Sequence, residues 1–218
     1  FEYFIVSFDQ FIGPIYSLII YCLDFKIESM RKVIINRLKT IEQNFKNFNN
    51  EAYFPLIENA AKMMINALRN KKKIMFCGNG GSAADSQHLS AELLGRYLKN
   101  RKPYASIALT TDTSVLTAIS NDLHFNEIFS RQVSALTNKN DILFAITTSG
   151  KSKNILLAID KAKKLGAKVI LLSSSKAKYL KKKVDLLIPV PADRVDRIQE
   201  MHISVGHIIC ELVEKNLN

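Results

Sequence analysis

The sequence predicts an α/β fold, a doubly wound five-stranded parallel sheet flanked by helices, with a helical extension at the N-terminus. Three observations lead to this fold class. Five short apolar runs occur between residues 74 and 190, helical stretches separate them, and glycine- or hydroxyl-rich turns follow the first and third runs. Apolar runs that alternate with helices are typical of strands buried on both faces of a parallel sheet.

Residues 1–29 are expected to be a dispensable extension, because Met30 is a plausible natural start. The apolar run from Phe11 to Leu23 is short, is interrupted by Gly13 and Pro14, and has no basic segment before it. These features fit neither a membrane span nor a signal peptide, so no membrane partner is expected. An interfacial anchor is the alternative that stays open.

Two amphipathic helices are expected before the first strand. Apolar residues recur at three- and four-residue steps over residues 29–47 and again over residues 51–70, and a pair of asparagines lies between the two stretches. The predicted domain organisation follows from this pattern. It has an N-terminal helical hairpin at residues 30–70 and an α/β domain at residues 71–218.

The α/β domain is expected to alternate strands with helices. The predicted strands are residues 74–77, 107–109, 142–146, 169–172 and 186–190. The predicted helices are Ser82–Lys99, Asp112–Ile119, Phe125–Leu136 and Ser152–Leu165, with a last helix from about Arg194 to Lys215. Ligands of open parallel sheets bind at the carboxyl ends of the strands, so the turns after the first and third strands are the candidate binding loops.

The composition is that of a globular protein, with 47% hydrophobic and 23% charged residues. The formal net charge of +11 permits an anionic partner. Most lysines are scattered along the chain, however, so solvated faces are the favoured interpretation and no nucleic-acid partner is expected. The three cysteines lie far apart and form no CxxC pair, which fits a reducing cytoplasm.

The turn after the third strand, Thr147-Thr148-Ser149-Gly150-Lys151-Ser152, has the features of an anion site. Hydroxyls and free backbone N–H groups meet there at the start of a helix, where the helix dipole is positive. An ordinary serine cap is the alternative. Lys151 strengthens the first interpretation, because a cation in the first turn opposes the dipole unless an anion is bound. A solvent-facing Lys151 is the other possibility.

The turn after the first strand, Gly78-Asn79-Gly80-Gly81-Ser82, brings three glycines together before a helix. Glycine lets the backbone approach a ligand closely. The segment is neither the GxGxxG fingerprint nor a P-loop, since the GK[ST] sequence is absent. A nucleotide is therefore not the favoured ligand.

Three side chains are candidates for metal binding or proton transfer. His88 and Glu92 are four residues apart on one helix face, which suits a divalent metal but also an ordinary surface pair. His207 lies close to the apolar stripe of the last helix and is expected to be buried, where a core histidine is the simpler interpretation.

Several segments together resemble the phosphoheptose isomerase branch of the sugar isomerase (SIS) domain family, over roughly residues 30–215. The matching segments are Gly78–Asp85, Gln87-His88, Ala91–Arg96, Asn121-Asp122, Phe129–Gln132, Thr148–Gly150 and Arg197–His202. The resemblance implies an SIS-type fold and a homotetramer with active sites between subunits. It also implies conversion of sedoheptulose 7-phosphate to D-glycero-D-manno-heptose 7-phosphate in bacterial polysaccharide synthesis.

The same resemblance implies roles for individual residues. Glu92 and His207 are the expected acid–base pair, and zinc is expected on His88, Glu92, Gln199 and His207. The expected substrate-binding residues are Asn79, Gly80, Gly81, Ser82, Asp112, Thr147, Thr148, Ser149, Ser152, Asp196 and Gln199. Two tensions accompany these roles. A carboxylate held tightly by metal is not a free base, and Gln199 and His207 lie about 12 Å apart along their helix.

Three alternatives stay open. The first is a non-catalytic SIS protein that binds a sugar phosphate or a replication-initiator protein, although the presence of both Glu92 and His207 favours the enzyme. The second is a sugar-phosphate-responsive DNA-binding regulator, although the N-terminal helices show no recognition-helix pattern. The third is an isomerase acting on a hexose or pentose phosphate.

Overall fold

The computed structural model describes residues 28–217 of the 218-residue chain. The expected extension at residues 1–29 therefore lies almost wholly outside the described residues. The chain divides into two compact units, residues 1–43 and residues 44–218. Residues 28–48 are helical and carry exposed apolar side chains such as Ile34 and Leu38. None of the helices in the described part is both long and apolar enough to cross a membrane.

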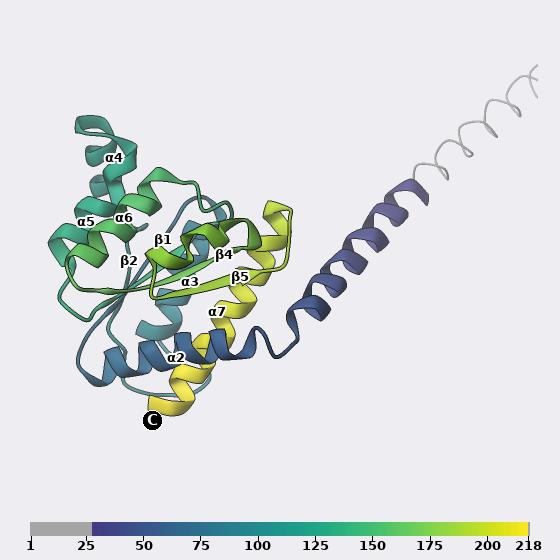
Figure 1. Cartoon of the computed structure of the whole chain (residues 1–218), viewed down its shortest axis with the longest axis horizontal. Coiled ribbons are helices and arrows are strands. Elements are labelled where there is room, and N and C mark those ends of the chain that lie inside the picture. Colours follow the sequence, from purple (N-terminus) through teal and green to yellow (C-terminus); the bar gives the residue numbers. More distant parts are fainter. Residues whose placement is uncertain (1–27, 218) are drawn as a thin grey trace, which may run out of the picture. The chain divides into compact units, whose positions relative to one another are not determined.

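The second unit is built on a five-stranded, all-parallel sheet in the order β2-β1-β3-β4-β5 (Figure 1). The strands are β1 (Ile74–Gly78), β2 (Ser106–Ala108), β3 (Ile142–Ile146), β4 (Lys168–Ser174) and β5 (Leu186–Val190). Their registers place Phe76 beside Phe144 and Phe144 beside Ile170. The order changes direction beside β1, so the sheet is doubly wound as the sequence predicts.

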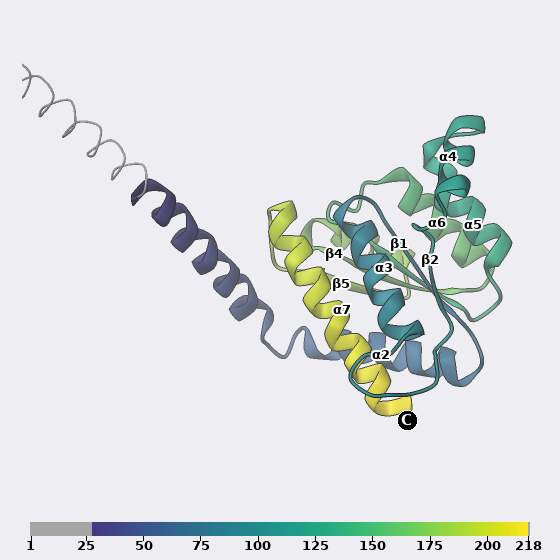
Figure 2. The same ribbon diagram turned by 180° about the vertical axis from the view of Figure 1, so that it is seen from behind.

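Helices cover both faces of the sheet (Figures 1 and 2). On one face lie α2 (Phe54–Arg69), α3 (Gly81–Leu94) and α7 (Val195–Leu217), and on the other lie α5 (Ile128–Leu136) and α6 (Lys153–Lys164). Successive strand residues alternate between these layers, since Phe76 packs in the α7 layer while Met75 and Cys77 pack in the α6 layer. Both layers exclude water, which explains why the central strands β1 and β3 are buried at every position and carry no charged side chain.

The remaining elements are short. They are α4 (Thr113–Asp122) and two 3₁₀ helices, η1 (Phe125–Glu127) and η2 (Ser175–Lys183). The predicted helices agree with the observed ones within a few residues, except that the helix expected to reach Lys99 ends at Leu94. Arg101 explains the early end, because its guanidinium donates to the carbonyls of Glu92 and Leu93 and takes the place of a further helical turn.

Helix α2 packs against α7 and β5 inside the second unit. Its apolar residues Ala60, Ala61 and Met64 are almost completely buried there. The proposed division into an extension, a hairpin at residues 30–70 and an α/β domain at residues 71–218 stays a prediction.

Candidate active site

A pocket of about 240 Å³ lies at the carboxyl ends of β1 and β3, where the sequence predicts the binding loops. Both loops line it, together with the first turns of α3 and α7. The lining residues are Asn79, Gly80, Gly81, Ser82, Ile146, Thr147, Thr148, Ser152, Val195 and Gln199. Eight of the predicted substrate-binding residues are therefore brought together around one hollow.

The glycine-rich loop is tightly packed against its neighbours. A Cβ on Gly78 would lie 2.4 Å from the carbonyl oxygen of Ser82, and one on Gly81 would lie 2.4 Å from Nε2 of Gln199. Gly80 has a φ of 55°, a left-handed conformation that glycine adopts readily. These glycines let the backbone at the start of α3 form the wall of the pocket.

A pair of amides joins the two loops. Asn79 Nδ2 donates to Asn154 Oδ1, and Asn154 Nδ2 donates back to Asn79 Oδ1, both at 2.9 Å. Asn154 is buried in the first turn of α6, and its Oδ1 also accepts from the N–H of Ile155. The sequence analysis did not single out Asn154, because an asparagine two residues past the cap of α6 gives no local signal of a partner 75 residues away.

Three predicted substrate-binding residues lie outside this lining. Asp112 is the N-cap of α4 and accepts from the N–H of Val115 at 3.0 Å. Asp196 forms ion pairs with Arg194 and Arg197. Ser149 is exposed, and its Oγ accepts from the N–H of Lys151 at 3.1 Å. Their assignment to the substrate stays a prediction.

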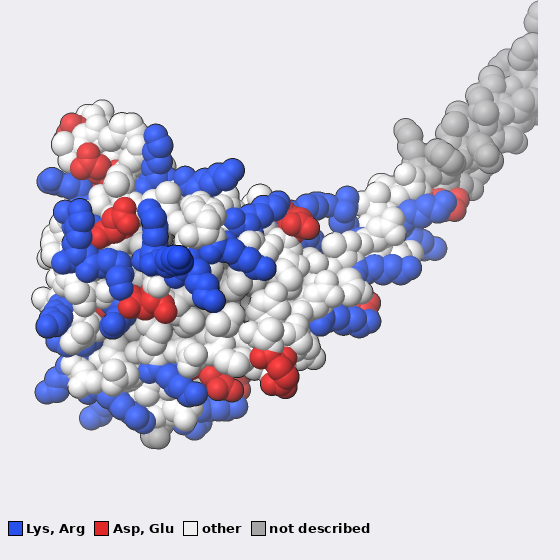
Figure 3. All heavy atoms as spheres, in the orientation of Figure 1, with Lys and Arg blue, Asp and Glu red and all other residues white. Residues whose placement is uncertain are grey.

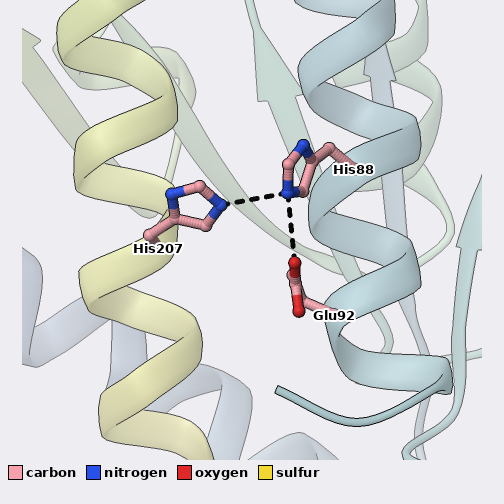
Figure 4. Close-up of side chains that lie close together, drawn as sticks. All are labelled: His88, Glu92 and His207. Atoms are coloured by element: carbon pink, nitrogen blue, oxygen red, sulfur yellow. Dashed lines mark hydrogen bonds and ion pairs between the residues drawn. The ribbon is translucent and has the colours of Figure 1, made fainter. Parts of the chain in front are cut away.

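A second group of side chains gathers further along α3 and α7 (Figure 4). His88 Nε2 lies 3.1 Å from Glu92 Oε1 and 3.1 Å from His207 Nε2. The three ligand atoms all lie within 4.8 Å of one another. His207 is only half-buried, so the expectation of a buried ring was wrong. The buried histidine of α7 is His202, and burial lowers the pKa of His202 to about 4, although the nearby backbone of Ser173 partly offsets this.

The cluster forms because α3 and α7 run side by side in the same direction. Gly81 meets Gln199 at the start of the helices, and Leu89 meets Gly206 further along. A Cβ on Gly206 would lie 2.5 Å from Leu89, so this glycine permits the close approach. His207 therefore stands at the edge of the helix pair, with its ring facing His88 (Figure 4).

The packing of α7 along α3 also separates Gln199 from His207. Its side chain lies over Gly81 and lines the pocket, whereas His207 lies eight residues further along α7, a rise of about 12 Å. The assignment of Gln199 to the substrate pocket suits this position. Its assignment to the metal stays a prediction.

Tyr97 closes one side of the cluster. Its ring stacks on His207 with centroids 5.9 Å apart and an interplanar angle of 16°. The loop that carries Tyr97 is fixed by Glu214 of α7, whose carboxylate accepts from the N–H groups of Tyr97, Leu98 and Lys99 and from Arg101 Nε. The sequence analysis missed this support, because the partners are more than 110 residues apart.

Asp85 lies one helical turn before His88 on α3. One of its carboxylate oxygens, Oδ2, is buried and has no hydrogen-bond partner in the described part of the chain. Burial raises the pKa of Asp85 to about 6, although the nearby His88 opposes the shift. A carboxyl group that titrates near neutrality beside a candidate site is itself a candidate functional group. The resemblance includes Asp85, but its sequence context gives no reason to expect this pKa.

The cluster fits a divalent metal on the chemistry of its donors. Two imidazole nitrogens and a carboxylate are the ligand set of many zinc sites. Ligands about 2.0–2.1 Å from one tetrahedral ion lie roughly 3.3 Å from each other, close to the 3.1 Å that separates His88 Nε2 from each of the other two ligand atoms. The sequence prediction of a metal site is supported at His88, Glu92 and His207.

The chain matches the family model of the SIS domain over residues 38–174, more than half of its length. It is 45% identical over 190 residues to a phosphoheptose isomerase of Nitratiruptor sp., covering 87% of this chain and 99% of that protein. It is 52% identical over 163 residues to a phosphoheptose isomerase of Rhodospirillum rubrum, covering 75% and 87%. The chain belongs to the phosphoheptose isomerase branch of the SIS domain family.

The solved structure of a phosphoheptose isomerase from Francisella tularensis superposes on the chain with a TM-score of 0.81 and 37% identity, covering 85% of this chain and 98% of that one. This likeness confirms the predicted SIS-type fold. The phosphoheptose isomerase family also confirms the prediction of an enzyme, in preference to a non-catalytic regulator.

Proposed function

We propose that the protein converts sedoheptulose 7-phosphate to D-glycero-D-manno-heptose 7-phosphate through an enediolate. The observation that carries the proposal is the placement of two groups along α3. Ser82 lines the pocket and His88 lies six residues further on, a rise of about 9 Å. In an open-chain heptulose the phosphate and the reacting carbons C1 and C2 lie at opposite ends, which suits a phosphate pocket separated from an acid–base cluster.

The pocket holds the phosphate. Hydroxyl-bearing Ser82, Thr147 and Ser152 line it, and α3 and α6 begin beside it, so the positive ends of both helix dipoles favour an anion there. Binding energy from the phosphate, remote from the reacting carbons, positions C1 and C2 at the cluster. A shorter sugar phosphate held at the same pocket would reach the cluster less well, so a heptose fits this separation better than a pentose.

The cluster performs the proton transfers. Glu92 takes the C1 proton and returns one to C2, and His207 exchanges the proton of the neighbouring oxygens. Oε1 of Glu92 is hydrogen-bonded to His88 Nε2. No described residue forms a hydrogen bond with the other carboxylate oxygen, Oε2, so that atom is available as the base. A zinc ion held by His88, Glu92 and His207 would supply positive charge where the oxyanion develops.

Three further proposals follow from the family. We propose a homotetramer in which a neighbouring subunit completes each site. The exposure of His88, whose side chain is 52% accessible, supports this because it leaves the cluster open on one side. We also propose a cytoplasmic location and a role in heptose supply for bacterial polysaccharide. Light scattering of the purified protein tests the tetramer.

Turnover of sedoheptulose 7-phosphate, followed by separation of the two heptose phosphates, tests the proposed reaction. The protein is assayed as isolated, after treatment with EDTA, and after zinc is restored. We expect activity to be lost with the chelator and regained with zinc. Fructose 6-phosphate and ribulose 5-phosphate are the comparison substrates, and we expect lower kcat/KM for both. A zinc-loaded protein that leaves the heptose phosphate unchanged would contradict the proposal.

A further inference from the structure

Two serines at the end of β4 hold the phosphate loop from behind. Ser173 Oγ donates to the carbonyl of Thr147 at 2.5 Å, and Ser174 Oγ donates to the carbonyl of Thr148 at 2.7 Å. The register of the sheet creates these contacts. The last pairing of β3 with β4 is Ile146 with Leu172, so the next two residues of each chain segment lie beside each other. Both serines are completely buried, so they have no access to a ligand.

A third hydroxyl holds the same loop from η2. Tyr179 Oη donates to the carbonyl of Gly150 at 2.9 Å. Gly150 has a φ of 70°, and a Cβ there would lie 2.8 Å from the Cβ of Ala177, so η2 packs directly on the loop. Three of the four carbonyls between residues 147 and 150 are therefore bonded by side-chain hydroxyls on one side of the loop.

These hydrogen bonds fix the direction of the peptide N–H groups. A trans peptide points its carbonyl and the following N–H in opposite directions. Because the carbonyls of Thr147 and Thr148 point at β4, the N–H groups of Thr148 and Ser149 point away from it. In the sheet order, β1 lies on the other side of β3 from β4, so that direction is toward the glycine-rich loop and the pocket.

The same N–H groups have no acceptor among the described residues. The N–H of Thr147 bonds Leu172, that of Gly150 bonds Thr147 Oγ1 and that of Lys151 bonds Ser149 Oγ. Among the described residues, the N–H groups of Thr148 and Ser149 have no hydrogen-bond acceptor. Neighbouring unpaired N–H groups in a loop before a helix form an anion-binding concavity.

We propose that Ser173, Ser174 and Tyr179 are positioning residues for phosphate, which act by locking the peptide planes of residues 147–150. If its side-chain hydroxyl donor is removed, a carbonyl in this loop would rotate toward the pocket and accept a hydrogen bond from water there. That rotation would replace a positive dipole end with a negative one at the phosphate. The inference rests on the proposed function for the identity of the sugar, but not for the anion.

Three variants test the proposal, Ser173→Ala, Ser174→Ala and Tyr179→Phe, and each removes one hydroxyl. The matched controls are Ser134→Ala and Tyr53→Phe, and Tyr53 lies just before α2, where its ring packs on Phe48. Ser134 donates to the carbonyl of Ser130 within α5, the same kind of bond away from the pocket. Each protein is titrated with inorganic phosphate by calorimetry and assayed with sedoheptulose 7-phosphate, and its unfolding temperature is recorded.

We expect the Kd for phosphate and the KM to rise by about threefold to tenfold in each variant, the size of one lost hydrogen bond, with kcat changed by less than about twofold. The controls should change neither constant. Tyr179→Phe is the decisive variant, because the Tyr179 side chain is largely exposed and its loss of one oxygen leaves the ring in place.

Two results would overturn the proposal. One is an unchanged phosphate Kd in Tyr179→Phe, whether or not the unfolding temperature falls, since that pattern marks a purely structural hydroxyl. The other is wild-type protein that does not bind phosphate. A protein that binds phosphate with the expected losses but does not turn over the heptose phosphate would refute the proposed reaction while leaving this inference intact.

Discussion

The Nε2 atoms of His88 and His207 lie 3.1 Å apart, although 119 residues separate them in the chain. At that distance one nitrogen donates a hydrogen bond and the other accepts it. Burial lowers the pKa of His207, the nearby His88 lowers it further, and Glu92 opposes the shift. The lowered pKa favours the neutral form of His207, which binds metal or accepts a proton.

Variants of the two residues in the proposed acid–base pair test whether each one serves catalysis, metal binding or both. We expect His207→Ala and Glu92→Gln each to lower kcat by about 10²–10⁴-fold, the usual contribution of a positioned acid or base. Metal analysis of each protein shows whether zinc is lost as well. Glu58→Gln, which alters an exposed glutamate of α2, is the control. Activity within twofold of wild type in either site variant would contradict the assigned roles.

The sequence predicted the fold well because the central strands are buried on both faces. Such strands, for example residues 142–146, are apolar at every position, and that signal is local. The two binding loops were predicted for the same reason, since they follow strands directly. The meeting of His88 with His207 required the resemblance, because no local pattern tells which helices lie side by side.

Long-range partners explain what the sequence did not show. The end of α3 at Leu94 depends on Arg101, and Arg101 depends on Glu214 more than 110 residues later. The half-buried state of His207 depends on Leu89, which approaches Gly206 and leaves the neighbouring ring at the edge of the interface. Apolar periodicity gives the face of a helix but not the shape of the surface that packs against it.

The buried ion pair of Glu214 with Arg101 should be important for stability. Their side chains are 1% and 3% accessible, and Nε of Arg101 lies 2.9 Å from Oε1 of Glu214. Glu214→Gln leaves the guanidinium buried without its counter-charge. We expect the free energy of unfolding to fall by about 3–5 kcal/mol. Urea denaturation at pH 7 measures this, and Glu58→Gln should change the same quantity by less than about 1 kcal/mol.

The same carboxylate should make stability depend on pH. Burial alone would raise the pKa of Glu214, but hydrogen bonds from Leu98, Tyr97, Arg101 and Lys99 lower it below its ordinary value of 4.5. A lowered folded pKa means that the stabilisation is present above pH 4.5 and is lost as the pH falls below it. Urea midpoints between pH 3 and 7 should show a fall that is smaller in Glu214→Gln. An equal fall in both proteins would exclude Glu214 as a source.

Gly150 should be needed both for stability and for phosphate binding. Gly150→Ala places a Cβ at a φ of 70° and 2.8 Å from Ala177. We expect the free energy of unfolding to fall by about 1–3 kcal/mol and KM to rise. Gly166→Ala is the matched control, because Gly166 has a φ of 78° but lies at the opposite end of α6. It should lose stability without a change in KM, and an equal rise of KM in both variants would contradict a local effect.

Lys151 should contribute to phosphate binding through its charge. It lies in the turn before α6, where its charge opposes the positive end of the helix dipole. Lys and Arg side chains cover much of the face in Figure 3, so the background potential already favours anions. Lys151→Asn should raise KM by about twofold to fivefold, the worth of one exposed charge pair, without changing the fold.

The dependence of KM on salt concentration distinguishes the charge of Lys151 from an effect of the substitution on the shape of the loop. An exposed charge is screened with a Debye length of about 10 Å at 0.1 M salt and about 3 Å at 1 M. The difference in KM between Lys151→Asn and wild type should therefore shrink as sodium chloride rises from 0.05 to 1 M. Lys161→Asn, at the opposite end of the same helix, should leave KM unchanged at both concentrations. A difference that persists at 1 M would mean that Lys151 shapes the loop, and an unchanged KM would reject the role of its charge altogether.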